Sequence, residues 1–470
     1  MKPIQKILII IIYYLILGSF IYFVVVGDSF WKGFINWIWD QLQKEYIKFG
    51  FLLIIGIDML ITLTPLILYR RKNVNKEIVP IRDDIALIIP VHKGEEIIQK
   101  TLEHALEVFQ SHNIFVIDNG KHEINFDNTQ QICNNLNVNY YYIPIGSKTS
   151  AIYAGLKLTH NYKYVMQIDD DVHLNPNMSF PIKDDTDIIA YTIGVDINNK
   201  IIEYLQDIEY KMSGITKAYK SHFGSDMFCH GAISLWRREV FLDVLEHHPM
   251  YTISDDWFNG YVSNSLGYRL SVCDKDFILT DVPNKFLISS GRLSGYGNIT
   301  LFSQRYKRWY RSKFLQLFYV LYYILFSWNQ KIKILIVQKF FFILDILRLI
   351  FAVAKFLLII PYFYLNYQLS LIMLFVYLTY SIVVILIFNF WNLQKHERIP
   401  IYVICINPLY RLYDSFILFG AYISSIVLYT PILIITKQKK LKKNVLLNNT
   451  INQYLENDFS YNSVSTPRSI

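Results

Sequence analysis

The sequence predicts an α/β fold, a mostly parallel sheet with flanking helices, joined to an α-helical transmembrane region. Apolar strand-like runs alternate with segments of helical apolar spacing between residues 85 and 171, and this alternation is typical of a parallel sheet covered by helices. The second observation is composition, because the 470 residues are 53% hydrophobic and only 18% charged. Such a chain is too apolar for an ordinary soluble protein, so part of it is expected to lie in lipid.

The N-terminal region contains two apolar segments, at residues 6–26 and 49–69. The first carries no charge after Lys6 and is long enough to cross a hydrocarbon core of about 30 Å. A secretory signal has a shorter apolar region and a small-residue cleavage site, so we interpret the segment as a retained span. Basic residues at both outer flanks predict that residues 1–76 form a transmembrane hairpin with its two ends in the cytoplasm.

The C-terminal region contains three further apolar blocks. They lie at residues 334–360, 369–391 and 399–436. Charged residues inside the first block indicate that its early part, and residues 314–328 before it, lie in the membrane interface. The last block is interrupted by "INPLYRLYD", so it forms either two short crossings or a re-entrant segment plus one crossing. We expect interfacial and transmembrane helices over residues 313–436 and a basic, disordered cytoplasmic tail over residues 437–470.

The intervening residues 83–312 have the composition of a cytoplasmic globular domain. Four strand-like runs, each ending in polar or turn residues, lie at 85–92, 113–120, 138–146 and 162–171. Segments with helical spacing of apolar residues lie between them at 95–110 and 150–160. The binding groups of such a sheet gather at the carboxyl ends of its strands.

Acidic residues occupy those strand ends. Asp118 closes the second run, and Asp169, Asp170 and Asp171 close the fourth. Adjacent carboxylates repel one another, and a divalent cation that prefers oxygen ligands, Mn2+ or Mg2+, offsets that repulsion. Because Mg2+ takes its remaining ligands from substrate phosphates and water, the pattern suits a nucleotide diphosphate. The alternative is a solvated acidic loop, but the position after a buried-type strand favours a metal and nucleotide site.

Other classes of site find little support in the sequence. It contains no GxxxxGK[ST] phosphate loop, no evident nucleophilic triad and no metal-type spacing among its four cysteines and eleven histidines. The net charge of +8 is concentrated beside the apolar segments. Membrane topology accounts for it, so no nucleic-acid partner is expected.

Seven motifs occur in an order that resembles a known family. They are "IALIIPVHKGEE", "FVIDNG", "GSKTSAIYAGL", "MQIDDDVHLNPN", "HGAISLWRREVF", "SDDW" and "RYKRW", within residues 83–312. Together they resemble the membrane-embedded family 2 glycosyltransferases, which include hyaluronan, chitin and cellulose synthases and ceramide glucosyltransferase. The resemblance implies a GT-A-type fold and transfer from a UDP-sugar with inversion. The flanking apolar segments are similar to those of the hyaluronan and chitin synthase group.

The resemblance also implies roles for single residues. Asp118 resembles the carboxylate that binds the uracil of the donor, and Lys148 is similar in position to a basic residue along the nucleotide. Asp169 and Asp171 match the metal-binding pair, with Asp171 the more direct ligand. Asp256 matches the catalytic base.

The motif "SDDW" that contains Asp256 also has other readings. Without the resemblance, Ser254 and Asp255 would be read as residues that cap a helix. As a base, Asp255 is the alternative to Asp256, and Trp257 indicates a sheltered environment that would raise the pKa of the carboxyl. His230 precedes a stretch that resembles the acceptor-side loop of the family, although an isolated histidine is more often structural.

The stretch "RYKRW" matches the (Q/R)xxRW motif of the family through Arg305, Arg308 and Trp309, since Gln304 lies one position too early. An indole face can stack on a sugar ring, and guanidinium groups can bind diphosphate oxygens bidentately. The alternative reading, a basic anchor beside the membrane, is kept for three neighbouring residues: Lys307, Arg311 and Lys313. The first strand departs from the family by ending in "HKGEE", and no gating-loop motif of the cellulose synthase type occurs.

The sequence therefore predicts a multi-pass enzyme, in the plasma membrane, that polymerises and exports a β-linked polysaccharide resembling chitin or hyaluronan. Its expected partners are a UDP-sugar donor, a growing glycan or lipid acceptor, and membrane lipids. A lipid glycosyltransferase that adds a single sugar, similar to ceramide glucosyltransferase, is the alternative. A membrane scaffold without activity would leave the aligned carboxylates without a purpose. The sugar is left open.

Overall fold

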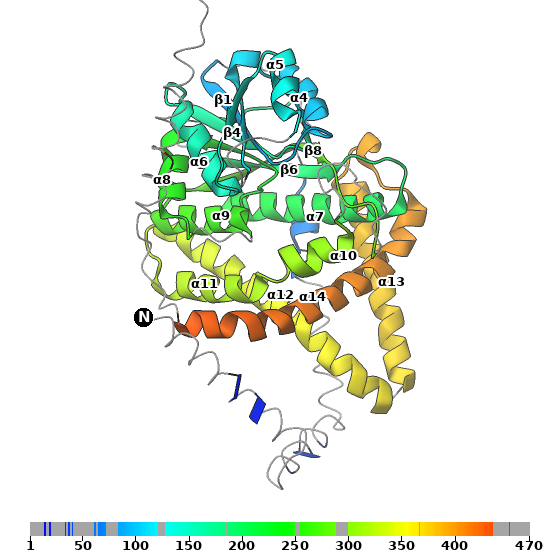
Figure 1. Cartoon of the computed structure of the whole chain (residues 1–470). Coiled ribbons are helices and arrows are strands. Elements are labelled where there is room, and N and C mark those ends of the chain that lie inside the picture. The colour runs from blue at the N-terminus through cyan, green and yellow to red at the C-terminus, as the bar shows by residue number, and fades with distance from the viewer. Residues whose placement is uncertain are drawn as a thin grey trace, which may run out of the picture. The chain divides into compact units, whose positions relative to one another are not determined.

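The computed structural model describes residues 64–71, 83–120, 127–183, 187–249, 254–287, 299–365 and 367–435, with a few isolated positions elsewhere (Figure 1). The chain divides into two compact units. One contains residues 68–304, 320–341 and 441–470, and the other contains residues 1–67, 305–319 and 342–440. Most of the predicted N-terminal hairpin and nearly all of the predicted C-terminal tail lie outside the described residues.

The first unit is built on one eight-stranded sheet with the order β3-β2-β1-β4-β7-β6-β8-β5. Its strands are β1 (Ile85–Val91), β2 (Ile114–Asp118), β3 (Asn139–Tyr142), β4 (Tyr164–Ile168), β5 (Val172–His173), β6 (Ile188–Val195), β7 (Ile233–Arg237) and β8 (Leu270–Thr280). The four strands predicted from the sequence, β1 to β4, pair in parallel. This half of the prediction is confirmed.

The other half of the sheet adds two strands of opposite direction, β5 and β7, to the mostly parallel arrangement that the sequence predicted. Strand β7 runs antiparallel to both β4 and β6, and β5 runs antiparallel to β8, while β6 and β8 are parallel. The sheet is therefore mixed. An apolar run indicates that a strand is buried but carries no information about its direction, so the reversal at β7 is invisible in the sequence.

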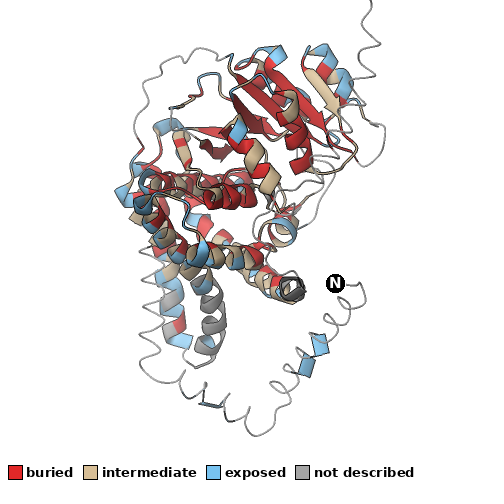
Figure 2. Ribbon diagram, turned by 90° about the vertical axis from the view of Figure 1, so that its left-hand side faces the viewer, coloured by how far each residue is buried: buried red, intermediate tan, exposed pale blue. Residues whose placement is uncertain are grey.

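Helices cover this sheet. They are α4 (Ile98–Leu106), α5 (Thr129–Asn135), α6 (Lys148–Leu158), α7 (Ile201–Phe223), α8 (Arg238–His247) and α9 (Asp255–Leu266). Helix α6 packs on β1 and β2, and Gly155 permits that approach, because a Cβ there would lie 2.9 Å from Ile88. Helix α7 packs on β6 and β8. Figure 2 shows the strands and much of α7 as buried, which places the apolar core between them.

Register in the parallel half brings the predicted site residues to one edge. Val91 of β1 lies opposite Asp118, and Asp118 lies opposite Tyr142 of β3. Strand β4 ends at Ile168, and the amide of Asp169 donates a hydrogen bond of 2.9 Å to the carbonyl of Ala232. The carboxylates that close β2 and β4 therefore share the carboxyl edge of the sheet, as predicted.

The second unit consists of helical segments. Helices α11 (Lys313–Phe326) and α12 (Ile332–Leu365) contribute to both units, whereas α13 (Tyr367–Trp391) and α14 (Ile401–Ile435) belong to this one alone. Among the described residues, one helix, Ser370–Trp391, is long and apolar enough to cross a membrane, with a mean hydropathy of 2.7. It coincides with the second predicted block.

The third block corrects a sequence expectation, because α14 is one unbroken helix through "INPLYRLYD". Side-chain partners satisfy the polar residues in its middle, so no chain break is needed there. Asn407 accepts a hydrogen bond of 3.1 Å from the Nε of Arg411, and the Tyr310 hydroxyl lies 2.6 and 2.7 Å from the two carboxylate oxygens of Asp414.

Candidate active site

Asp118 lies at the end of β2 and is almost completely buried. Its carboxylate accepts a hydrogen bond of 3.0 Å from the hydroxyl of Tyr140. Burial is the main influence and raises the pKa of Asp118 to about 6, while the bond from Tyr140 acts in the opposite direction. Asp118 therefore changes its charge just below neutral pH, and above that pH it offers a ligand a negatively charged hydrogen-bond acceptor.

Lys148 and Asp169 are brought together, as the sequence predicted. Lys148 is the first residue of α6, whose N-terminus is capped by the Oγ of Ser147 accepting from the amide of Ser150 at 3.3 Å. A lysine at a helix N-terminus is opposed by the helix dipole. The ion pair between the Nζ of Lys148 and the Oδ1 of Asp169 compensates for that cost and aims the ammonium group at the acidic cluster.

Asp170 and Asp171 complete the cluster. The pKa of each carboxyl is raised, first by burial and then by neighbouring carboxylates, while Lys148 acts in the opposite direction. The Oδ1 of Asp171 accepts a hydrogen bond of 3.3 Å from the hydroxyl of Thr280. Buried carboxylates that raise one another's pKa have the chemistry of a cation site, because a bound divalent ion would stabilise their ionised forms. These residues fit a divalent metal.

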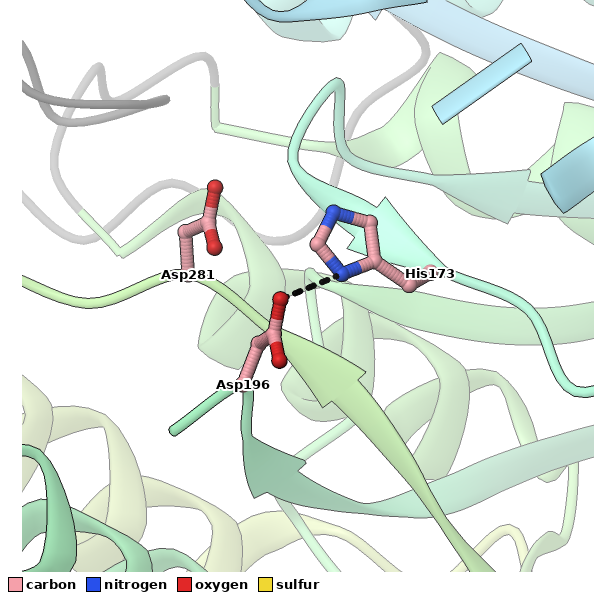
Figure 3. Close-up of side chains that lie close together, drawn as sticks. All are labelled: His173, Asp196 and Asp281. Atoms are coloured by element: carbon pink, nitrogen blue, oxygen red, sulfur yellow. Dashed lines mark ion pairs between the residues drawn. The ribbon is translucent and has the colours of Figure 1, made fainter. Parts of the chain in front are cut away.

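A second group of possible metal ligands adjoins this cluster. His173 of β5, Asp196 after β6 and Asp281 after β8 place one ligand atom each within 4.8 Å of one another. Figure 3 shows their side chains around a common space, with the Nδ1 of His173 3.3 Å from the Oδ2 of Asp196. The same oxygen lies 2.7 Å from the Nζ of Lys100. Burial lowers the pKa of His173 to about 4, so its imidazole is neutral at physiological pH, the state that binds metals.

The two groups are connected through Asp281. Its amide donates a hydrogen bond of 3.3 Å to the carbonyl of Asp171, and its charge contributes to raising the pKa of that carboxyl. The second group was missed from the sequence. Its signal was present, since "IGVD" and "ILTD" are apolar runs closed by an aspartate, just as β2 is closed by Asp118.

Asp256 lies in the first turn of α9, half-buried, with its Oδ1 accepting from the amide of Trp257 at 2.8 Å. A Cβ on Gly231 would lie 2.9 Å from the Cβ of Asp256, so the two residues pack directly. The carbonyl of Gly231 accepts a hydrogen bond of 2.9 Å from Gln167 of β4. Because the next residue of this loop bonds the amide of Asp169, one short loop connects Asp256 to the acidic cluster.

The start of α9 shows whether Ser254 caps the helix, which is the alternative reading of the motif "SDDW". Ser254 occupies the N-cap position, but its side chain makes no capping hydrogen bond and its φ is 58°. A positive φ is uncommon for a residue other than glycine and carries strain that often marks a functional site. Trp257 and Phe258 are buried, as the sheltered environment predicted from the sequence requires. The side chain of Asp255 lies outside the described residues.

His230 is buried and contacts a residue that the sequence did not suggest. The Nζ of Lys217 on α7 lies 2.9 Å from its Nε2 and 3.8 Å from the centroid of the Phe228 ring. Burial, with a contribution from Lys217, lowers the pKa of His230 well below its usual range. Nε2 therefore accepts from the ammonium group, and the ring proton is on Nδ1.

The predicted residues Arg305, Arg308 and Trp309 belong to the second unit and share a π-helix, Gln304–Trp309. Arg305 is buried, with its guanidinium carbon 4.0 Å from the centroid of the Trp309 ring. Its Nη2 lies 3.4 Å from the hydroxyl of Tyr410. Arg308 is exposed. Arg305 therefore covers one face of the indole, so only the opposite face could stack on a sugar.

Residues 82–295 match the family model described as Glycosyltransferase like family 2. The chain carries a glycosyltransferase family 2 domain. This domain makes the protein an enzyme, a family 2 glycosyltransferase, and the matched segment contains the acidic cluster, the second ligand group and Asp256. No curated protein sequence matches the chain.

Solved structures share the fold. A mannosyltransferase, PcManGT from Pyrobaculum calidifontis, in complex with GDP-Man and Mn2+, is 12% identical, with a TM-score of 0.50 over 85% of this chain and 100% of that chain. TarS of S. aureus is 13% identical, with a TM-score of 0.33 over 73% of this chain and 54% of that chain. Glucosyl-3-phosphoglycerate synthase from Mycobacterium tuberculosis, with Mn2+, UDP and phosphoglyceric acid, is 11% identical, with a TM-score of 0.28 over 42% of this chain and 70% of that chain. At 12% identity, the first supports the GT-A-like fold alone.

Proposed function

We propose that the protein is a membrane-bound, inverting glycosyltransferase that uses a UDP-sugar and a divalent metal to polymerise and export a β-linked polysaccharide resembling chitin or hyaluronan. The observation that carries the proposal is the acidic cluster Asp169–Asp171, of which Asp171 is buried, paired with Lys148 and connected by one loop to Asp256. A divalent metal would offset the negative charge of that cluster, and a diphosphate would supply oxygen ligands to the metal. The mannosyltransferase of similar fold is named in complex with GDP-Man and Mn2+, which supports a sugar nucleotide and a divalent metal as the donor pair without specifying the base.

The donor would bind at the carboxyl edge of the sheet. Asp118 accepts a hydrogen bond from the uracil, and Lys148 lies along the diphosphate, where its charge offsets the phosphate oxygens. Asp169 and Asp171 hold the metal, which when bound stabilises the charge that develops on the departing diphosphate. Arg305, Arg308 and Trp309 are assigned to acceptor and diphosphate binding.

Asp256 acts as the general base. It takes the proton of an acceptor hydroxyl while that oxygen forms a bond to the anomeric carbon from the face opposite the leaving group. The bond between the anomeric carbon and the diphosphate breaks, UDP departs with the electron pair, and the configuration is inverted. A positioned base contributes on the order of 10² to 10⁴ in rate.

The second ligand group offers another position for the metal. His173, Asp196 and Asp281 supply one nitrogen and two oxygen ligands, a set that also suits Mn2+. Binding of Mn2+ to the purified protein, followed by electron paramagnetic resonance, distinguishes the two. If Asp169 and Asp171 hold the donor metal, Asp171→Asn loses UDP-dependent Mn2+ binding and Asp196→Asn retains it.

Membrane attachment is part of the proposal. The candidate span Ser370–Trp391 supports it, and so does the apolar outer face of residues 320–341. The exposed side chains there include Leu325, Phe326, Trp328, Ile332, Ile336 and Phe340, each more than half exposed. An apolar helix face of this kind suits the bilayer interface. We assign residues 1–76 and 313–436 to the membrane region of a multi-pass protein, with the catalytic domain in the cytoplasm.

Transfer of one sugar to a membrane lipid is the second candidate. Export of a polymer needs a channel formed by several spans, whereas the described part of the chain contains one helix that passes the length and hydropathy criteria for a span. Transfer to a lipid needs attachment to the bilayer but no channel, and the exposed apolar side chains of residues 320–341 are an observation that suits a lipid acceptor.

The product separates the two candidates. Purified protein in lipid vesicles is supplied with labelled UDP-sugars, singly and in pairs, with Mn2+ or Mg2+, and the products are extracted and sized. A high-mass product supports the polymerase, and a small product soluble in organic solvent supports the lipid transferase. Asp169→Asn/Asp171→Asn must abolish either product, while the surface variant Asp83→Asn must not. Equal activity of the two variants would refute the assignment of the cluster.

A further inference from the structure

A buried polar network joins α9 to the helical hairpin formed by residues 320–341. At its centre, Asn264 of α9 is 1% exposed. Its Oδ1 accepts from the Nε2 of Gln338 on α12 and, at 2.8 Å, from the hydroxyl of Ser225. Its Nδ2 donates to the carbonyls of Asp226 and Gly260, both at 2.8 Å. Asn264 therefore uses its full hydrogen-bonding capacity, two acceptor and two donor positions.

The hairpin holds its own end of this network in a fixed position. Gln338 is fully buried, and its Oε1 accepts a hydrogen bond of 2.7 Å from the hydroxyl of Tyr323 on α11, which is also fully buried. One amide thus bridges the two helices of the hairpin and the central asparagine. A buried network that is fully satisfied specifies one arrangement, because any shift leaves a desolvated polar group without its partner.

The turn of the same hairpin caps the C-terminus of α9. Asn329 donates a hydrogen bond of 2.6 Å to the carbonyl of Ser265, and Gln330 donates one of 2.6 Å to the carbonyl of Tyr268. Gly267, which ends the helix, has a φ of 96°, and a Cβ there would lie 2.7 Å from the carbonyl oxygen of Asn329. The bond to Ser265 satisfies a carbonyl group that the helix end leaves open, and the bond to Tyr268 holds the chain just beyond the helix.

The central part of α9 is located by the loop that leads to His230. Gly260 faces the carbonyl of Met227 so closely that a Cβ would overlap it. Helix α9 is therefore held at its middle by the loop and at its C-terminal end by the hairpin. Asn264 lies eight positions after Asp256, about 12 Å along a rigid helix, so a displacement at Asn264 is transmitted to Asp256.

We propose that Gln338 and Tyr323 are positioning residues, which act through Asn264 to set the place of Asp256 in the active site. The inference rests on the proposed role of Asp256 as the base. It predicts that the hairpin governs the rate of transfer and leaves donor binding unchanged, since the hydrogen bonds given above join the hairpin to α9 and to the residue just after it. A misplacement of about 1 Å can cost on the order of 10²-fold in rate.

The test compares Gln338→Leu, which removes the hydrogen bonds at similar size, with Gln316→Leu. Gln316 is the matched control, a buried glutamine of α11 that bonds Ser312 in the other unit. We expect Gln338→Leu to lower kcat by about 10- to 100-fold, with the KM for the UDP-sugar and the affinity for UDP within twofold of wild type. Tyr323→Phe, which deletes one hydroxyl, is the milder variant if Gln338→Leu fails to fold, and it should lower kcat by a smaller factor.

Hydrogen exchange over residues 254–260 provides a readout apart from turnover, and it should increase in Gln338→Leu and not in Gln316→Leu. Unchanged kcat and unchanged exchange would overturn the inference, as would a parallel loss of kcat, UDP affinity and thermal stability. Asp256→Asn separates the two proposals. If that variant stays active, Asp256 is not the base, and the inference about Gln338 and Tyr323 is wrong as well. If it is inactive while Gln338→Leu turns over normally, the inference alone is wrong.

Discussion

The buried carboxyl of Asp118 predicts how donor binding depends on pH. Its pKa is raised to about 6 by burial, and the ionised form is the much stronger acceptor of a hydrogen bond from the imide N–H of uracil. With that pKa, about 90% of Asp118 is ionised at pH 7 and about 10% at pH 5. The affinity for the nucleotide should therefore fall about tenfold between pH 7 and pH 5 through this group alone.

The assay is calorimetric titration of UDP into the protein with Mn2+ at pH 5, 6, 7 and 8, for wild type and Asp118→Asn. The diphosphate and the acidic cluster also titrate in this range, and they do so in both proteins, so the ratio of the two affinities isolates Asp118. The ratio should shrink about tenfold from pH 7 to pH 5. A constant ratio would refute the uracil-binding role.

Stability gives an independent check on the same group. A carboxyl whose pKa is higher in the folded than in the unfolded state stabilises the fold at low pH, and that contribution is lost as the pH rises through the folded pKa of about 6. Without nucleotide, Asp118→Asn should therefore melt at a higher temperature than wild type at pH 7.5, and the difference should narrow at pH 5. A difference that widens on acidification would contradict the buried, raised-pKa description.

Three further predictions concern the rest of the site. Gly231→Ala should lower kcat about tenfold with little change in UDP affinity, because a Cβ there would lie 2.9 Å from the Cβ of Asp256. A loss of UDP affinity instead would show that this loop contributes to donor binding. Lys148→Met should weaken UDP binding by about 10-fold or more, since the ion pair with Asp169 is lost together with a phosphate-binding charge, and calorimetry should show no rescue by added Mn2+. Chelation of the metal should abolish turnover. Readdition of Mn2+ should restore turnover in wild type and in Asp196→Asn, but not in Asp171→Asn. Restoration in Asp171→Asn and not in Asp196→Asn would place the metal in the second ligand group.

The sequence predicted best what local patterns determine. Continuous apolar runs gave β1 to β4, and the carboxylates that close β2 and β4 lie at one edge of the sheet because parallel strands bring their carboxyl ends together. The direction of β7 could not be predicted, since a buried strand has the same composition in either orientation. The continuity of α14 through "INPLYRLYD" depends on partners such as Tyr310, far away in the chain.

Residues that meet only through the fold were missed for the same reason. His173, Asp196 and Asp281 come from three different strand ends. Lys217 lies on α7, and only the folded chain brings its ammonium group to the imidazole of His230. The sequence also treated Arg305 and Arg308 alike, whereas one is buried against Trp309 and the other is exposed. No local pattern distinguishes such a pair, because burial there is decided by tertiary packing.

The most direct test of the central claim is the turnover of UDP-sugar by Asp256→Asn, measured with UDP affinity in the same preparation. The substitution keeps the size of the side chain and removes its ability to take a proton. We predict that kcat falls by about 10² to 10⁴ while the affinity for UDP stays within twofold of wild type. Retention of activity within a few fold of wild type would contradict the account, because the carboxylate at the start of α9 would then not be the base.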